Sequence, residues 1–268
     1  KICLQRTTLV PSHSTGYTGG GGYDQIMRDQ ENLGKRVLFT GGRAPVTLEL
    51  ARQFSANGHR VYVAESLPIH LCSYSSSVYK NLSIPAPNDD LQGFGDGLAT
   101  IIEEHQIDIL IPTCEEVFHV SRVMQRLPER CLVFTENIGT LRRLHSKKEF
   151  IDYAASLGLP TPKTVVISSL EPVYQALEEG RDFVLKKVFS RFSSDTIVLP
   201  RAKRDVEGIL IDSQNLWVIQ DYLGHQQHCT YSVVHEGKIM AHGTYATSYT
   251  AGQGASIYFE QTQVESIY

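Results

Sequence analysis

The sequence has no close pair of cysteines, no long apolar run and no large excess of charge. Its five cysteines are scattered and odd in number, which argues against a disulfide framework and against a structural zinc site. No run approaches the roughly 18 apolar residues that span a bilayer, and the N-terminus lacks the apolar segment of a signal peptide. A formal net charge of −4 gives no general attraction to nucleic acid or to anionic membranes. We therefore expect a cytoplasmic protein without a nucleic-acid partner or a membrane partner.

The chain of 268 residues is long enough for about two domains, at roughly 150 residues each. Its first part, residues 1–34, holds four consecutive glycines among scattered polar residues. Such a segment buries too little apolar surface to offset the entropy lost on ordering, so we predict a flexible arm or linker there. A nucleotide-binding glycine loop is the alternative, although no apolar strand precedes these glycines.

From residue 35 onward, short apolar segments alternate with amphipathic ones. Pro45 suits the first turn of the first amphipathic segment, and Gly58 suits its end. Strands that alternate with helices predict a doubly wound parallel α/β sheet, so we assign residues 35–138 to a Rossmann-like domain. The expected strands read RVLFTGG, HRVYVAES, IDILIPTC and RCLVFTE, and the expected helices read PVTLELARQFSANG, GLATIIEEHQ and VFHVSRVMQRL.

The second half of the chain has the pattern of an α+β domain. It opens with the helix KKEFIDYAASLG, which Gly158, Pro160 and Pro162 bring to an end. Segments of strand character follow, with the helices EPVYQALEEG and AKRDVEGILID among them. The turn HEGK, from His235 to Lys238, places Glu-Gly at the centre of a hairpin. We therefore predict antiparallel strand pairing here, in contrast to the parallel pairing of the first half.

The turn TGGRAP, from Thr40 to Pro45, lies between a strand and a helix, and Glu65 ends the next strand. This arrangement is similar to a dinucleotide-binding fingerprint. The spacing is GG rather than GxGxxG, however, and the chain has no Tyr-x-x-x-Lys dyad. A tight strand-to-helix turn made by Gly41 and Gly42 explains the pattern better, and a nicotinamide-dependent oxidoreductase stays as an alternative function.

Two further motifs are weaker. His225 and His228 have a His-x-x-His spacing, but a zinc site needs about four ligands, so surface or turn histidines are the better interpretation and we expect no metal site there. Cys114 is followed by two glutamates. Neighbouring carboxylates disfavour a thiolate, so we expect no covalent catalysis at this cysteine.

Two lysines bring positive charge to elements about forty residues apart: Lys147 at the start of a helix and Lys186 on a strand. A polyphosphate is the ligand that most naturally compensates both charges, and the serine-rich loop from Ser190 to Asp195 offers backbone N–H groups to phosphate oxygens. The apolar segment VIQDYL has backbone N–H and C=O groups that could form hydrogen bonds with the edge of an adenine base. Solvated lysines at a strand end and on a helix surface are the alternative.

From about Arg36 to Tyr268, these features resemble the ATP-grasp superfamily of ATP-dependent ligases, with carbamoyl-phosphate-synthase-like and amino-acid-ligase-like relatives. The segment LHSKKEFIDYAASLGLPTPKT resembles the family pattern DKxxxxxxxxxxGxPxP, and FVLKK resembles the strand yvlKP. The segment WVIQDYLGHQQHCTYS resembles the hinge pattern vQeyixGxExs. The resemblance implies a pre-ATP-grasp domain, a lid subdomain with its leading helix over residues 139–215, and a hinge with part of the C-lobe over residues 216–268.

The resemblance also implies roles for individual residues. Lys147 and Lys186 would contact ATP phosphates, and the loop that contains Ser193 and Ser194 would close over them. The adenine would be framed by Gln220, Asp221, Tyr222 and Leu223. Gln227 takes the position of a ribose-binding glutamate, and the loop is rich in serine rather than glycine, so both sites depart from the family pattern.

The resemblance implies an enzyme that uses ATP and Mg²⁺ to join a small-molecule carboxylate to an amine through an acyl phosphate, and that could form a homodimer. The family's metal ligands lie on a late strand and in an ExNP motif, and the chain reaches Tyr268 before either. We therefore expect the metal ligands downstream of this sequence, in a longer natural protein. The main alternative is a catalytically inactive ATP-grasp fragment that binds nucleotide or has a regulatory role.

Overall fold

The computed structural model describes residues 34–190, 195–224, 227–247, 250–251, 255–256 and 260–262. These residues form two compact units, which meet in the sequence between Ile138 and Gly139. Each unit is described separately below. Apart from Gly34, the arm predicted over residues 1–34 lies outside the described residues.

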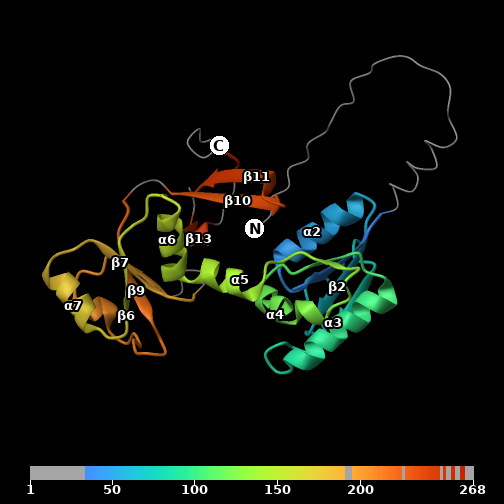
Figure 1. Cartoon of the computed structure of the whole chain (residues 1–268), viewed down its shortest axis with the longest axis horizontal. Coiled ribbons are helices and arrows are strands. Elements are labelled where there is room, and N and C mark those ends of the chain that lie inside the picture. Colours follow the sequence, from blue (N-terminus) through green and yellow to red (C-terminus); the bar gives the residue numbers. More distant parts are fainter. Residues whose placement is uncertain are drawn as a thin grey trace, which may run out of the picture. The chain divides into compact units, whose positions relative to one another are not determined.

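The first unit, which is drawn in blue to green in Figure 1, contains a parallel sheet. The sheet has five strands in the order β3-β2-β1-β4-β5. This confirms the predicted parallel α/β class. The strands are β1 (Arg36–Thr40), β2 (Arg60–Glu65), β3 (Lys80–Ser83), β4 (Ile109–Ile111) and β5 (Leu132–Val133). The helices are α2 (Pro45–Ala56), α3 (Leu91–His105) and α4 (Glu116–Val123), which a 3₁₀ turn, Met124–Arg126, extends.

The alternation of side chains along β1 explains how the sheet carries two layers of core. Leu38 belongs to the hydrophobic cluster that contains Phe94 and Leu98 of α3. Its neighbour Phe39 belongs to a second cluster, with Leu50 of α2. Successive residues of a strand point to opposite faces, so a continuous apolar run such as RVLFT is what a sheet covered on both faces requires.

The second unit contains an antiparallel sheet of four strands in the order β6-β9-β7-β8, which confirms the predicted change of pairing. Its strands are β6 (Thr164–Ile167), β7 (Phe183–Lys187), β8 (Thr196–Val198) and β9 (Trp217–Asp221). The helices are α5 (Ile138–His145), which starts at the last residue of the first unit, α6 (Lys147–Ser156) and α7 (Glu171–Glu178). Further hairpins pair β10 (His228–His235) with β11 (Lys238–Ala246) and β12 (Thr250–Ala251) with β13 (Ala255–Ser256).

Among the described residues, no helix is both long and apolar enough to cross a membrane.

The helix predicted over residues 202–212 is wrong. The structure has a single 3₁₀ turn there, Lys203–Val206. Gly208 follows with a φ of +81°, a left-handed conformation that ends helical geometry. Asp212 then accepts hydrogen bonds from the backbone N–H groups of Gln214 and Asn215, both at 2.7 Å, so a local turn replaces the helix.

Candidate functional site

Three polar residues predicted from the sequence converge on one cavity of the second unit. Lys147 lies in the first turn of α6, Lys186 lies near the end of β7, and Gln220 lies on the adjacent strand β9. The cavity has a volume of about 390 Å³. Its lining consists of Leu144, His145, Ser146, Lys147, Phe150, Ile151, Pro162, Lys186 and Gln220.

Both lysines donate hydrogen bonds to neutral oxygens. Nζ of Lys147 lies 2.9 Å from the carbonyl oxygen of Ser190, and Nζ of Lys186 lies 2.8 Å from Oε1 of Gln220. Within the described part of the chain, neither lysine forms an ion pair with a carboxylate. The cavity therefore holds two ammonium groups whose charge the described residues leave uncompensated.

Burial lowers the pKa of both lysines below the ordinary value of 10.5. For Lys186 the positive charge of Lys147 lowers the pKa further. Desolvation and like-charge repulsion both act against the charged form of a lysine. An anion bound between these two side chains would relieve both effects.

Gln220 is fixed at both ends of its amide. Oε1 accepts the hydrogen bond from Lys186, and Nε2 donates to Oγ1 of Thr164 at 2.9 Å. Thr164 lies opposite Gln220 in the β6–β9 pairing. Because Gln220 is buried and held in this way, it orients the Lys186 ammonium group toward the cavity.

The other predicted nucleotide-binding residues lie elsewhere. Asp221 forms an ion pair with Arg181 at 3.0 Å, and it follows Gln220 on the strand, so it points to the opposite face. Tyr222 and Leu223 are exposed beyond the end of β9, and Gln227 is also exposed. Ser193 and Ser194 lie outside the described residues.

Lys187, next to Lys186, has different surroundings. Its strand position places it on the face that Phe183 and Leu185 bury in the core of the second unit. Its charge helps to lower the pKa of Asp212, after hydrogen bonds from Asn215 and Gln214. Of these two adjacent lysines, only Lys186 lines the cavity. Variants of the two residues can therefore be compared, with Lys187 as the control for Lys186.

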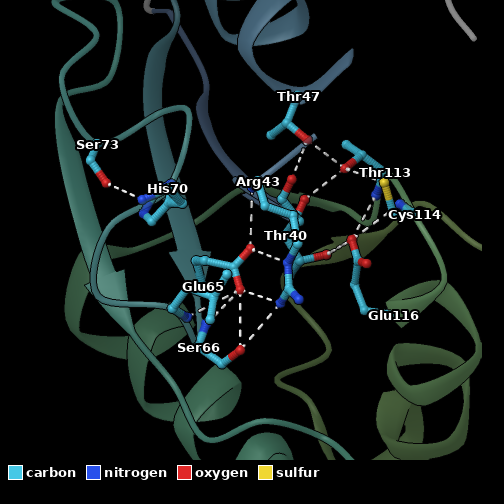
Figure 2. Close-up of polar contacts among 12 residues, drawn as sticks. Thr40, Arg43, Thr47, Glu65, Ser66, His70, Ser73, Thr113, Cys114 and Glu116 are labelled. Carbon is cyan, nitrogen blue, oxygen red and sulfur yellow. Dashed lines mark hydrogen bonds and ion pairs between the residues drawn. The ribbon is translucent and has the colours of Figure 1, made fainter. Parts of the chain in front are cut away.

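The first unit has a cavity of about 250 Å³ at the carboxyl ends of its strands. Figure 2 shows the polar contacts at its edge, where Arg43 forms an ion pair with Glu65. Nε of Arg43 donates to Oε2 of Glu65 at 3.1 Å, and the backbone N–H of Ser66 donates to Oε1 at 2.8 Å. Burial acts to raise the pKa of Glu65, but these hydrogen bonds and one from the backbone of Leu67 outweigh it and lower the pKa.

This geometry argues against a nicotinamide cofactor. In a dinucleotide-binding fold, the acidic residue at the end of the second strand accepts hydrogen bonds from ribose hydroxyl groups. Here, both oxygens of Glu65 already accept hydrogen bonds from Arg43 and from the chain that follows β2. Gly41 has a φ of +76°, as the tight strand-to-helix turn requires. The glycine pair is therefore explained by the turn itself.

Glu116 is a site residue that the sequence analysis does not find. Its Oε1 accepts hydrogen bonds from Oγ1 of Thr40 at 3.0 Å and from the backbone N–H groups of Thr113 at 3.2 Å and Cys114 at 3.1 Å. It joins the ends of β1 and β4, which are separated by more than 70 residues. The motif Cys114-Glu-Glu marks the position, but no local pattern indicates a contact with Thr40.

Neither profiles of protein families nor curated protein sequences match the chain. Solved structures do match its fold. N5-carboxyaminoimidazole synthetase from Staphylococcus aureus, solved with ADP, superposes with a TM-score of 0.62 at 14% identity, over 81% of this chain and 56% of that chain. L-Amino acid ligase from Bacillus licheniformis superposes with a TM-score of 0.61 at 13% identity, over 87% of this chain and 56% of that chain.

Pyruvate carboxylase from Rhizobium etli gives a TM-score of 0.59 at 11% identity, over 81% of this chain and 21% of that chain. The chain thus spans little more than half the length of the first two enzymes, and about a fifth of the third. At these identities the matches establish the fold. Over about four fifths of its length, the chain has the fold of ATP-grasp enzymes.

Proposed function

We propose that the protein is an ATP-dependent ligase that joins a carboxylate to an amine through an acyl phosphate. One observation carries the proposal: Lys147 and Lys186 lie in one cavity, half-buried, without an anionic partner among the described residues. The ADP in the Staphylococcus aureus synthetase, which has the same fold, supports a nucleotide as the missing anion.

The energetics of burial favour this interpretation over solvated lysines. A buried charge without a partner is costly, and proteins keep such groups where a ligand compensates them. The cavity also lies at the N-terminus of α6, where Ser146 is the N-cap residue and backbone N–H groups favour a negative charge. Two ammonium groups and a helix N-terminus together suit a di- or triphosphate.

The proposed reaction has two steps. A carboxylate oxygen of the substrate attacks the γ-phosphorus of ATP, and ADP leaves. The amine nitrogen then attacks the acyl carbon, inorganic phosphate leaves, and the nitrogen loses a proton. Lys147 and Lys186 would hold the phosphates and stabilise the charge on them, so this chain contributes positioning and electrostatics rather than acid–base chemistry.

Mg²⁺ would accompany the nucleotide and neutralise part of its phosphate charge. No group of three or more potential metal ligands is found in the described segments. No step of the proposed reaction is assigned to a metal ligand of this chain.

Substitution of each of the two adjacent lysines of β7, followed by measurement of ATP binding, tests the nucleotide site. We expect Lys186→Met to weaken ATP binding at least about tenfold, or roughly 1.4 kcal/mol, in isothermal titration calorimetry. Lys187→Met is the matched control, because its side chain lies on the other face of the strand, and it should bind ATP as the unaltered chain does. Equal losses for both variants would contradict the proposed site.

Phosphate release separates the ligase from a binding module. The full-length natural protein is incubated with ATP, Mg²⁺ and a panel of carboxylates and amines, and phosphate release that depends on both substrates supports the ligase. Tight ATP binding without any release would support the inactive nucleotide-binding module. Thermal stabilisation by NADH and not by ATP would overturn both and favour the oxidoreductase.

A further inference from the structure

A continuous chain of hydrogen bonds links Lys186 to the backbone of Pro162. Nζ of Lys186 donates to Oε1 of Gln220 at 2.8 Å, and Nε2 of Gln220 donates to Oγ1 of Thr164 at 2.9 Å. Oγ1 of Thr164 then donates to the carbonyl oxygen of Pro162, also at 2.9 Å. Thr164 and Gln220 are both buried, with 9% of each residue exposed, so little water competes for these hydrogen bonds.

The direction of this chain of hydrogen bonds is determined at both ends. An ammonium group only donates, so Lys186 requires the oxygen of the Gln220 amide and leaves its nitrogen to face Thr164. A carbonyl oxygen only accepts, so Pro162 takes the hydroxyl hydrogen of Thr164 and leaves the hydroxyl lone pairs for Gln220. Reversal of the amide would place two donors against each other at Lys186. Thr164 thus stabilises the one orientation of Gln220 that accepts from the lysine.

The two lysines of the cavity differ in what holds their acceptors. Lys147 donates to the carbonyl oxygen of Ser190, which belongs to the main chain. Lys186 donates to a side-chain amide, whose terminal torsion has no sharp preference of its own. A lysine has a flexible four-carbon stem, so a fixed acceptor reduces the entropy that Lys186 loses when it binds an anion. Lys186 therefore depends on Thr164 in a way that Lys147 does not.

Gln220 has both ends of its amide engaged in this chain of hydrogen bonds. The resemblance to the ATP-grasp superfamily implies a position for Gln220 beside the adenine. Its hydrogen bonds and its burial instead connect it to the ammonium group of Lys186, which would hold phosphate. A change in the pair of Thr164 and Gln220 should therefore act on phosphate ligands with and without a base.

We propose that Thr164 is a positioning residue of this cavity, which acts through Gln220 to hold Lys186 ready for phosphate. The inference rests on the proposed nucleotide site for the identity of the bound anion. The chain of hydrogen bonds does not depend on that identity, so the two proposals can be tested separately.

Thr164→Val tests the positioning role, because valine keeps the shape and β-branching of threonine and removes only the hydroxyl group. Binding of ATP and of inorganic tripolyphosphate is measured by isothermal titration calorimetry. We expect both affinities to fall about fivefold, because Lys186 loses its fixed acceptor. Thr164→Ser keeps the hydroxyl group and should bind both ligands as the unaltered chain does. A loss for ATP with unchanged binding of tripolyphosphate would overturn the proposal.

Thr196→Val is the matched control. Thr196 lies opposite Lys186 on β8, which pairs with the other edge of β7, so the same substitution is made beside the same lysine. Thr196 takes no part in the hydrogen bonds that link Lys186 to Pro162. We expect this variant to bind ATP as the unaltered chain does. A loss equal to that of Thr164→Val would contradict the role of Thr164.

A double-mutant cycle tests whether Thr164 acts through Gln220. Gln220→Met keeps the length of the side chain and removes the amide, so it should weaken ATP binding about tenfold. In that background Thr164→Val should have no further effect on ATP affinity, because the link to Lys186 is already lost. Additive losses would overturn the proposal, since Thr164 would then act on the site independently.

Hydrogen exchange of side-chain amides provides a test that needs neither a variant nor a nucleotide. In the isotope-labelled unaltered chain, we expect the amide of Gln220 to exchange at least about tenfold more slowly than that of Gln175. Gln175 also donates to a side chain, that of Glu179, but it is exposed on α7. Equal exchange rates would overturn the chain of hydrogen bonds, even if Thr164→Val failed to fold.

The two proposals fail separately in these measurements. Tripolyphosphate binding that depends on Thr164, without any binding of ATP, would contradict the nucleotide site and leave the positioning role in place. ATP binding that Thr164→Val leaves unchanged would overturn the positioning role and leave the nucleotide site in place.

Discussion

The two cavities of this protein differ in how their charges are held. In the first unit, Arg43 and Glu65 compensate each other, and Glu116 is anchored by three hydrogen bonds. In the second unit, the hydrogen-bond acceptors that the described residues offer to Lys147 and Lys186 are neutral, and burial lowers the pKa of both lysines. The first cavity thus holds its charged side chains in a hydrogen-bonded frame, and the second carries positive charge that is partly desolvated.

The difference indicates how each cavity has to be tested. Removing a group from the first cavity disturbs the frame that joins β1 to β4, so stability will fall. Removing a lysine from the second cavity relieves a cost of burial, so stability and binding will change in opposite directions. The predictions below use this contrast.

The largest effect is expected from Gly41→Ala. A Cβ atom at Gly41 would lie 2.5 Å from Oε1 of Glu116 and 2.7 Å from Oγ1 of Thr113, and the residue has a φ of +76°. We expect the first unit to lose about 3 kcal/mol of unfolding free energy in urea denaturation. Gly58→Ala is the matched control, because its φ is +83° but no atom lies within 4 Å of the added Cβ. It should lose about 1 kcal/mol. Similar losses would show that backbone conformation, and not crowding of the frame, determines the cost.

The second prediction concerns Lys147 at the start of α6. Lys147→Met should weaken ATP binding about tenfold, because the variant removes one of two ammonium groups in the cavity. The same variant should leave the thermal unfolding temperature unchanged or raise it, since a half-buried charge is lost. Lys148→Met is the control, because Lys148 instead pairs with Asp152 along the helix. A lower unfolding temperature together with unchanged ATP binding would mean that Lys147 is structural.

Ser146→Ala should have a smaller effect. Oγ of this buried serine accepts the backbone N–H of Glu149 at 3.2 Å and caps α6. Loss of an N-cap costs about 1 kcal/mol, which urea denaturation can measure. Ser156→Ala, at the exposed end of the same helix, should change stability by less than about 0.5 kcal/mol. If ATP protects the Ser146 variant less than it protects the unaltered chain, the cap also contributes to the nucleotide site.

The smallest effect is a change in how stability depends on pH. Lys147 and Lys186 have a lower pKa in the folded chain than the ordinary value of 10.5, so the unfolded chain binds more protons between the two values. Stability from these groups therefore rises as the pH increases toward 10.5. The double variant Lys147→Met, Lys186→Met should lack this rise in thermal unfolding curves. Saturating ATP should also suppress it, because bound phosphate compensates the charges. An identical pH profile for the variant and the unaltered chain would contradict the burial of both lysines.

Much of the fold could be predicted from the sequence because apolar periodicity reports directly on burial. The run RVLFT gives a strand buried on both faces, and β1 is that strand. The strand β3 and the helix α5 were not predicted. Strand β3 reads KNLS and lies at the edge of the sheet with mostly exposed side chains, so its sequence has no apolar signal. Its position is determined by pairing with β2, which is a non-local interaction.

The candidate sites were predictable only in part, for the same reason. Lys147 and Lys186 were found because a resemblance linked two distant segments, and spacing alone left solvated lysines as an alternative. The contact between Thr40 and Glu116 spans 76 residues and has no local pattern. Arg43 belongs to the predicted turn TGGRAP, but no local pattern predicts its ion pair with Glu65, because that contact depends on the parallel pairing of β1 with β2.

The alternation of Lys186 and Lys187 along β7 has a consequence for insertions and deletions. Loss of a single residue within the strand, between Phe183 and Leu185, would move each later side chain to the opposite face. The ammonium group of Lys187 would then replace that of Lys186 in the cavity, and Lys186 would face the apolar core. Length variation should therefore be tolerated at the exposed hairpin of Glu236 and Gly237 and be almost absent within β7.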